Sequence, residues 1–170
     1  CRKVRIALKE KDLEFELKTE NLWQRRPEFL ALNPAGDLPV MIEDDGLVLS
    51  DSAAICEYLE ETAPTPALIP GNSAERAEIR RLVAWFDIKF EREVSANLVG
   101  EKILRRFLRR ESPNASAIRA GKENIHHHLD YIGWLTDRRT WLAGAKFSLA
   151  DIAAAAHLSA LDYLDDVQHC

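Results

Sequence analysis

The stretch Asn33 to Ser52, NPAGDLPVMIEDDGLVLSDS, decides the fold because it combines two turns, two short strands and the start of a helix. Residues 33–36 are typical of a turn, in which proline fixes φ and glycine accepts a positive φ. Residues 38–42 and 47–49 predict short strands joined by an Asp-Gly hairpin tip. Pro39 has no N–H to donate, so we expect it at the first residue of its strand or on a sheet edge.

A helix is predicted directly after the hairpin. Ser50, Asp51 and Ser52 all suit the N-cap position, because their short side chains can accept hydrogen bonds from the first helical amides. Residues 53–61 follow with apolar side chains at helical spacing. The sequence therefore predicts a capped helix that begins where the hairpin ends.

This ordered set of signals resembles the glutathione-binding half of the glutathione transferase superfamily. The shared pattern is Asn-Pro-x-Gly-x-Leu-Pro, a hairpin, an acidic residue with serine, and then Ala-Ile-x-x-Tyr-Leu. The resemblance implies a two-domain α+β/α fold, with a thioredoxin-like domain at residues 1–62, a linker at 63–72 and an all-helical domain at 73–170. It also implies a homodimer, and a first strand that would precede Cys1.

The resemblance also implies a glutathione site. Leu38, before a cis Pro39, would offer its backbone amide and carbonyl to glutathione. Ser52 and the free amides of the helix would hold the γ-glutamyl carboxylate, and Asp51 would pair with the ammonium group. Many relatives carry Glu or Gln in place of Asp51, so the shorter side chain predicts weaker binding. A thioredoxin-like domain needs the same turn and the same cap to fold, whether or not it binds a ligand.

The group that lowers the pKa of the glutathione thiol is expected before Cys1, so no catalytic residue is assigned. In relatives with a Cys-x-x-Cys or Ser-x-x-Cys pattern, Cys1 would stand at the second, resolving position. At a helix start its thiol could be reactive, but a structural or incidental role is favoured. Glutathione is thus a possible ligand or substrate, and we expect no required cofactor.

Composition indicates a soluble globular protein. The net charge is −5, with the acidic excess in residues 1–63, and no run of about eighteen apolar residues predicts a membrane span. Three widely spaced cysteines suggest a reducing cytoplasm. The consecutive residues His126 to His128 diverge around a helix, so we expect no metal site there.

Two further elements are predicted before residue 33. Residues 1–11 have the pattern of an amphipathic helix, and Leu13 to Leu17 alternate as a half-buried strand does. Trp23 follows in a loop rich in arginine. It is either packed on its domain or an exposed anchor for a partner, since Trp is enriched at binding hot spots.

A long helix after residue 73 carries an apolar stripe, and its continuation carries a basic one. We call these basic residues the basic stripe. The simplest interpretation is that they form a solvent-exposed helix face. The alternative is a docking surface for an acidic protein tail, with Arg105 and Arg109 as partner-binding residues. No interleaved aromatics support nucleic-acid binding. The members of the basic stripe are Lys102, Arg105, Arg106, Arg109 and Arg110.

The last helix is predicted to begin with a capping box. Ser148 and Asp151 are spaced so that each side chain can reach the other residue's backbone amide. The same motif resembles the cap of the central helix in the C-terminal domain of glutathione transferases. We therefore assign structural capping to these two residues.

Two functions remain open at this point. One is a cytosolic enzyme that conjugates glutathione to an electrophile, and the other is a non-catalytic binding module built on the same fold. Four features, namely CRKVRIAL at residues 1–8, the Trp23 loop, the long basic helix and LDYIG at residues 129–133, resemble the FzlA group of alphaproteobacteria. Members of that group bind the division protein FtsZ. That resemblance favours the binding module, with FtsZ or another acidic protein as partner.

Overall fold

The computed structural model describes residues 1–108 and 111–164. The chain divides into two compact units. Unit 1 is Cys1–Leu68, and unit 2 begins at Ile69. The narrower domain limits of 1–62 and 73–170, with a linker between them, stay a prediction.

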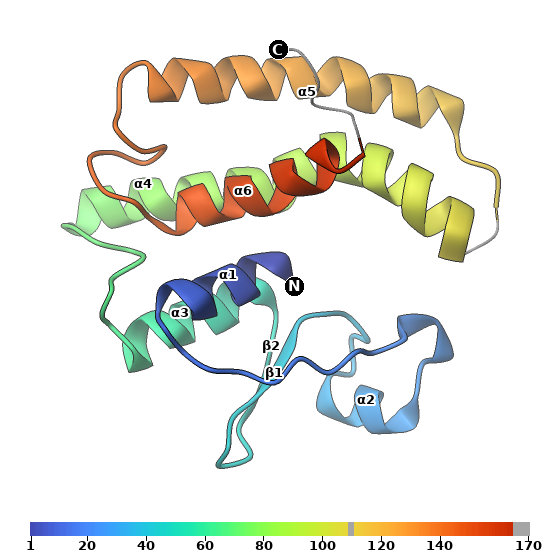
Figure 1. Cartoon of the computed structure of the whole chain (residues 1–170), viewed down its shortest axis with the longest axis horizontal. Helices are drawn as coiled ribbons and strands as arrows, with labels where there is room; N and C mark the ends of the chain where they lie inside the picture. Colours follow the sequence, from blue (N-terminus) through green and yellow to red (C-terminus); the bar gives the residue numbers. More distant parts are fainter. Residues whose placement is uncertain (109–110, 165–170) are drawn as a thin grey trace. The chain divides into compact units, whose positions relative to one another are not determined.

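Unit 1 contains a two-stranded hairpin and three helices. Strands β1 (Val40–Ile42) and β2 (Val48–Ser50) are antiparallel, with Val40 opposite Ser50. Helices α1 (Arg2–Glu10) and α3 (Ser52–Thr62) pack against each other (Figure 1). A 3-10 turn, η1 (Leu22–Gln24), and helix α2 (Pro27–Leu32) precede the hairpin. The buried apolar side chains of α1 and α3 are Val4, Ala7, Leu8, Ile55, Cys56 and Leu59.

The predicted strand at Leu13 to Leu17 is wrong. Residues 13–20 have no strand structure, because a strand needs a hydrogen-bonded neighbour and the only sheet of the described residues pairs β1 with β2. The alternating pattern still predicts burial in part, since Leu13 and Phe15 are half-buried while Glu14 and Glu16 are exposed. Leu17 breaks the pattern at 59% exposure.

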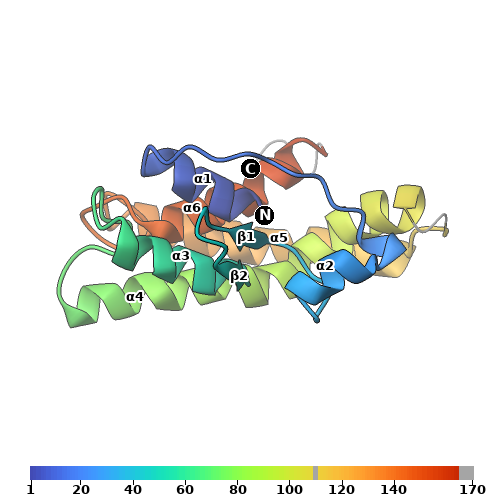
Figure 2. The same ribbon diagram turned by 90° about the horizontal axis from the view of Figure 1, so that it is seen from below.

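Unit 2 is a helical bundle around one long helix. Helix α4 (Ser73–Ala84) continues into the π-helical η2 (Trp85–Leu108), which packs against both α5 (Ala115–Thr136) and α6 (Leu149–Asp162) (Figure 2). The predicted apolar stripe is confirmed, and its members are Ile79, Leu82, Val83, Phe86, Phe90 and Val94. In the residues that the structure describes, none of the helices is both long enough and apolar enough to span a membrane.

Helix α5 buries a polar side chain between apolar ones. Ile125, His128 and Leu135 are buried, whereas Leu129, next to His128, is only half-buried. Gly121 explains part of this arrangement, because a Cβ there would lie 2.9 Å from Cγ of Leu98. The glycine therefore allows α5 to approach η2 closely.

Two hydrogen bonds explain how His128 is buried. The indole N–H of Trp85 donates to Nδ1 of His128 at 3.1 Å, and Nε2 lies 3.2 Å from the carboxylate of Glu93. Because Trp can only donate, Nδ1 must accept, so Nε2 carries the proton and donates to Glu93. The buried imidazole is thus neutral and fully hydrogen-bonded.

This network predicts a pH-dependent stability. Burial lowers the pKa of His128 below its usual value, and the opposing effect of Glu93 is smaller. Below about pH 6.5 the unfolded chain therefore binds a proton that the folded chain does not, and stability falls as the pH falls. The measurement is urea unfolding between pH 5 and pH 8. His128→Gln should remove this part of the pH dependence.

The matched control is His127→Gln, because His127 is the exposed neighbour on the same helix. It should leave the profile of the native sequence unchanged. An identical profile for the His128 variant would contradict the prediction.

Glu93 affects stability in a more acidic range. Its hydrogen bond to Lys89 is the main cause that lowers its pKa to about 2. Its contribution to stability is therefore complete above about pH 4.5 and is lost as the pH falls from there toward 2.

Candidate functional site

The strand register of the hairpin brings the predicted glutathione-site residues together. Leu38 and Pro39 come just before β1, and Asp51 and Ser52 come just after β2. Since Val40 is opposite Ser50, continuing the antiparallel register places Pro39 next to Asp51 at one end of the hairpin. The four residues therefore share one end of the sheet in unit 1.

A buried asparagine fixes the loop that leads into this end. Asn33 is 6% exposed, and its amide donates to the carbonyl of Asp37 at 2.8 Å while its oxygen accepts from the N–H of Ala35 at 3.2 Å. The Leu38–Pro39 peptide bond is cis, as the family resemblance implies, and Leu38 is 39% exposed. The backbone of Leu38 is therefore held in place by a side chain that the sequence marked only as part of a turn.

Asp51 has an unusual backbone and a hydrogen-bonded side chain. Its φ of 75° is in the left-handed region, which costs free energy for a residue other than glycine and is common at functional sites. Its Oδ1 accepts from the N–H groups of Ala53 at 2.7 Å and Ala54 at 3.1 Å. Asp51 is thus the N-cap of α3.

This cap changes the expectation of where a ligand carboxylate would bind at the start of α3. The first free amides of α3 were expected to hold a carboxylate of the ligand, but two of them already bind Asp51. Ser52 differs, since within the described residues no hydrogen bond engages its hydroxyl or its backbone N–H. The hydroxyl and backbone N–H of Ser52 are therefore the groups that remain to bind an anion.

Substitutions of Asp51 test the cap directly. Asp51→Ala should lower the free energy of unfolding by about 1 kcal/mol or more, because it removes the cap and keeps a Cβ at a positive φ. Asp51→Gly should cost only a few tenths of a kcal/mol, since glycine relieves the backbone strain. Urea unfolding of both variants provides the measurement. Equal losses for Ala and Gly would show that the backbone at this position is not strained.

Trp23 is presented by an ordered turn. It belongs to η1 and is 47% exposed, which agrees with the exposed alternative and not with packing on the domain, while its role as an anchor stays a prediction. Its N–H donates to Oδ1 of Asn21 at 3.3 Å, and Arg25 closes the turn with a φ of 43°. Arg26 then pairs with Glu20 through two hydrogen bonds of 3.1 and 2.8 Å. The loop is thereby held in one conformation around a half-exposed indole.

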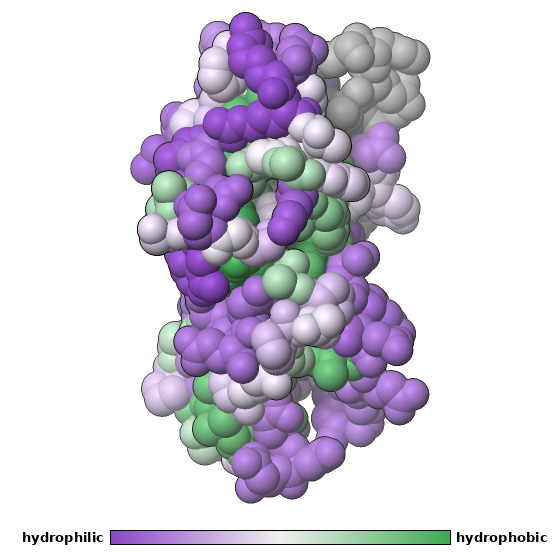
Figure 3. Space-filling view, turned by 90° about the vertical axis from the view of Figure 1, so that its left-hand side faces the viewer, coloured by the Kyte–Doolittle hydropathy of each residue, from purple (hydrophilic) through white to green (hydrophobic). Residues whose placement is uncertain are grey.

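Arg105, from the basic stripe, is neutralised locally. Its guanidinium lies 3.3 Å from a carboxylate oxygen of Glu101 and 3.1 Å from one of Glu111. Glu101 stands one helical turn earlier, so this pairing was readable in the sequence. Arg109 and Arg110 lie outside the described residues. Figure 3 shows a different face, on the left-hand side of Figure 1, which is mostly hydrophilic with small separate hydrophobic patches.

The remaining predicted residues lie apart from these sites. Ser148 and Asp151 form a capping box at the start of α6, where the Asp151 carboxylate accepts from the Ser148 N–H at 2.9 Å. Cys1 is exposed at the start of α1, and Cys56 is buried in α3. Neither cysteine belongs to a disulfide.

Comparisons with known proteins identify the fold family. Residues 1–62 match the model of the glutathione S-transferase N-terminal domain, and residues 95–168 match that of the C-terminal domain. FtsZ-localized protein A of Caulobacter vibrioides is 48% identical over 98% of this chain and 74% of its own length. Glutathione S-transferase F13 of Arabidopsis thaliana is 31% identical over 88% of this chain and 70% of its own length.

Solved structures agree with this assignment. A glutathione S-transferase from Rhodospirillum rubrum F11 has a TM-score of 0.96 at 56% identity, over 98% of this chain and 75% of that one. FzlA from C. crescentus has a TM-score of 0.92 at 47% identity, again over 98% of this chain and 75% of that one. The chain therefore belongs to the glutathione S-transferase family.

Proposed function

We propose that this protein is a non-catalytic binding module for the division protein FtsZ, and that it regulates FtsZ filaments in bacterial cytokinesis. Its similarity to FtsZ-localized protein A supports this, since the identity is 48% over nearly the whole chain. In this proposal the protein acts in the cytoplasm as a homodimer. Glutathione is at most a weakly held ligand.

The observation that carries the proposal is the cap made by Asp51. An enzyme of this family must hold the γ-glutamyl end of glutathione, and a free helix start is well suited to a carboxylate. Here Oδ1 of Asp51 occupies two of the α3 amides at 2.7 and 3.1 Å. A side chain bound to its own helix competes with the ligand for the same donors, which weakens glutathione binding.

One observation favours the alternative, a cytosolic transferase that conjugates glutathione to an electrophile. Ser52, at the start of α3, keeps its hydroxyl and backbone N–H without a partner among the described residues. Several relatives and structural neighbours are also described as glutathione S-transferases. Weak glutathione binding is therefore compatible with the site, and an assay must separate the two functions.

The partner-binding surface is proposed to include Trp23. A half-exposed indole on an ordered turn loses little conformational entropy on binding, which is the property of a hot-spot residue. Arg105 is a weaker candidate because Glu101 and Glu111 already pair with it. Arg109 stays a candidate on its position in the sequence alone.

The test compares FtsZ co-sedimentation with glutathione binding in the full-length protein. We expect co-sedimentation with FtsZ filaments, no turnover with a generic electrophile, and glutathione binding no tighter than millimolar in calorimetry. Trp23→Ala should reduce co-sedimentation, whereas Trp134→Ala should not, although Trp134 is equally exposed at 48%. Sub-millimolar glutathione binding with turnover and no co-sedimentation would overturn the proposal.

A second variant tests the role of the cap. Asp51→Glu restores the longer side chain of many relatives, and Glu is not among the preferred N-cap residues. It should free the α3 amides and strengthen glutathione binding about ten- to a hundredfold. Unchanged affinity would mean that the Asp51 cap is not what limits glutathione binding.

A further inference from the structure

The turn that presents Trp23 carries a second exposed side chain, that of Arg25. This turn comes directly before α2 in unit 1 (Figure 1), and Arg25 follows Trp23 by two residues. The partner-binding surface proposed above includes only Trp23 from this unit. Arg25 adds a positive charge to the same turn.

The backbone of Arg25 lies in a region that is unfavourable for a long side chain. Its φ of 43° and ψ of 47° are left-handed, a conformation that glycine adopts at little cost and that bulky residues rarely adopt. Two contacts hold the turn in this form. The N–H of Arg25 donates to the carbonyl of Leu22 at 3.3 Å, and Arg26 is bound to Glu20. Glycine would suit this position better, so the fold does not explain the arginine, and strain of this kind is common at functional sites.

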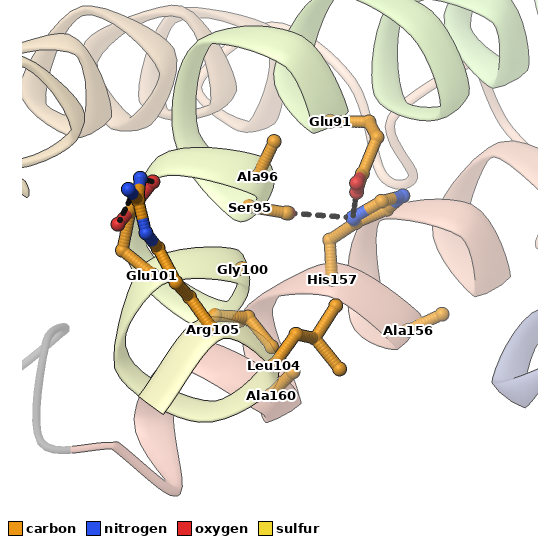
Figure 4. A pocket seen from close by; sticks show the side chains of 11 residues that line it. Glu91, Ser95, Ala96, Gly100, Glu101, Leu104, Arg105, Ala156, His157 and Ala160 are labelled. Carbon is orange, nitrogen blue, oxygen red and sulfur yellow. Dashed lines mark hydrogen bonds and ion pairs between the residues drawn. The ribbon is translucent and has the colours of Figure 1, made fainter. Parts of the chain in front are cut away.

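The guanidinium of Arg25 also differs from others in the chain in its lack of a carboxylate partner. Arg26, its neighbour, makes two hydrogen bonds to Glu20 of 3.1 and 2.8 Å. Figure 4 shows Arg105 paired in the same way with Glu101. Among the described residues, no hydrogen bond or ion pair engages the side chain of Arg25. Of the two adjacent arginines, Arg26 therefore holds the loop and Arg25 is available to a partner.

The charge around the turn indicates the kind of partner that it fits. Residues 1–63 carry the acidic excess of the chain, whereas residues 21–27, NLWQRRP, contain two arginines and no acidic residue. Because Glu20 neutralises Arg26, the uncompensated charge of this segment is that of Arg25. An acidic partner is thus repelled by much of unit 1 and attracted at this turn.

We propose that Arg25 binds a carboxylate of FtsZ while Trp23 packs against apolar side chains beside that carboxylate, so that the turn recognises an acidic and partly apolar segment. This inference rests on the proposed function and names the chemistry that the Trp23 surface recognises. An arginine holds a carboxylate through two parallel N–H donors, and arginine and tryptophan are both enriched at binding hot spots. A segment without the carboxylate leaves the guanidinium unpaired, which gives the turn its specificity.

The test measures the affinity of the full-length protein for FtsZ filaments by co-sedimentation, at two salt concentrations at which FtsZ polymerises equally. Arg25→Gln should weaken binding about tenfold or more at the lower salt concentration and make the affinity less dependent on salt. Arg25→Lys keeps the charge without the two parallel donors and should give an intermediate affinity. The matched control is Arg5→Gln, which removes an exposed positive charge from α1 and should change the affinity less than about twofold.

A glycine variant separates recognition from folding. Arg25→Gly should bind FtsZ as weakly as Arg25→Gln does, with a urea midpoint no lower than that of the native protein, because glycine relieves the left-handed backbone.

The outcomes distinguish this inference from the proposed function. Native affinity in Arg25→Gln together with lost binding in Trp23→Ala would overturn the inference and leave the proposed function in place. An equal loss in Arg5→Gln and Arg25→Gln would also overturn it, since net charge would then account for the effect. No binding of FtsZ by the native protein would overturn both.

Discussion

Lys11→Met is expected to lower the free energy of unfolding by about 3–5 kcal/mol, because it leaves a buried carboxylate without its cation. Lys11 lies at the end of α1, with its side chain 0% exposed, and Glu60 of α3 has a side chain that is 8% exposed. The ammonium group lies 3.0 Å from Oε2 of Glu60. Few surface substitutions in this chain should approach that cost.

The ammonium group of Lys11 also holds the segment after α3. It donates to the carbonyls of Ala63 at 2.6 Å and Pro66 at 3.0 Å, while Glu60 accepts from the N–H of Leu68 at 3.0 Å. All three ammonium donors are therefore used. The loss in Lys11→Met should appear as faster amide hydrogen exchange at residues 63–68, in addition to the lower stability in urea.

A surface pair provides the matched control. Lys18 lies 3.7 Å from Glu16, with both side chains about 80% exposed, so Lys18→Met should change stability by less than about 0.5 kcal/mol. Combining Lys11→Met with Glu60→Gln should recover part of the loss, because the uncompensated charge is then removed. A loss below about 1 kcal/mol in Lys11→Met would contradict the role given to this ion pair.

The sequence predicts local features of this protein well and distant contacts poorly. The hairpin and the α6 cap depend on residues within a few positions of one another, so turn and capping chemistry is sufficient to place them. The cis Pro39 was expected from the family resemblance. The pairing of Lys11 with Glu60 joins residues 49 positions apart, and no local pattern encodes it. The burial of His128 likewise depends on Trp85 and Glu93 in another helix.

The candidate site shows the same division. The sequence places Asp51 and Ser52 at a helix start, but three adjacent residues there could all serve as the cap, and only the observed φ of 75° and the bonds to Ala53 and Ala54 select Asp51. One ion pair of the basic stripe is a local feature that the sequence analysis did not use. Glu101 stands one helical turn before Arg105, so their pairing at 3.3 Å follows from i, i+4 spacing.

Asp151→Ala is expected to lower the free energy of unfolding by about 3 kcal/mol, since its carboxylate joins the loop before α6 to the first turn of that helix. Oδ1 accepts from the N–H of Leu142 at 2.9 Å. Oδ2 accepts from the N–H of Ser148 at 2.9 Å and from its hydroxyl at 3.1 Å. Ser148 is 0% exposed, so water cannot readily replace the lost acceptor.

Two further substitutions separate the contributions of the individual hydrogen bonds to this loss of stability, and a third provides the control. Ser148→Ala removes one hydroxyl donor and should cost about 1 kcal/mol, because the Asp151 carboxylate keeps both backbone donors. Asp151→Asn retains one acceptor oxygen and should lie between the two alanine variants. Asp162→Ala makes the same change at the exposed end of α6 and should stay within about 0.5 kcal/mol of the native stability. If Asp151→Ala costs no more than Ser148→Ala in urea unfolding, the carboxylate caps the helix without connecting the loop to it.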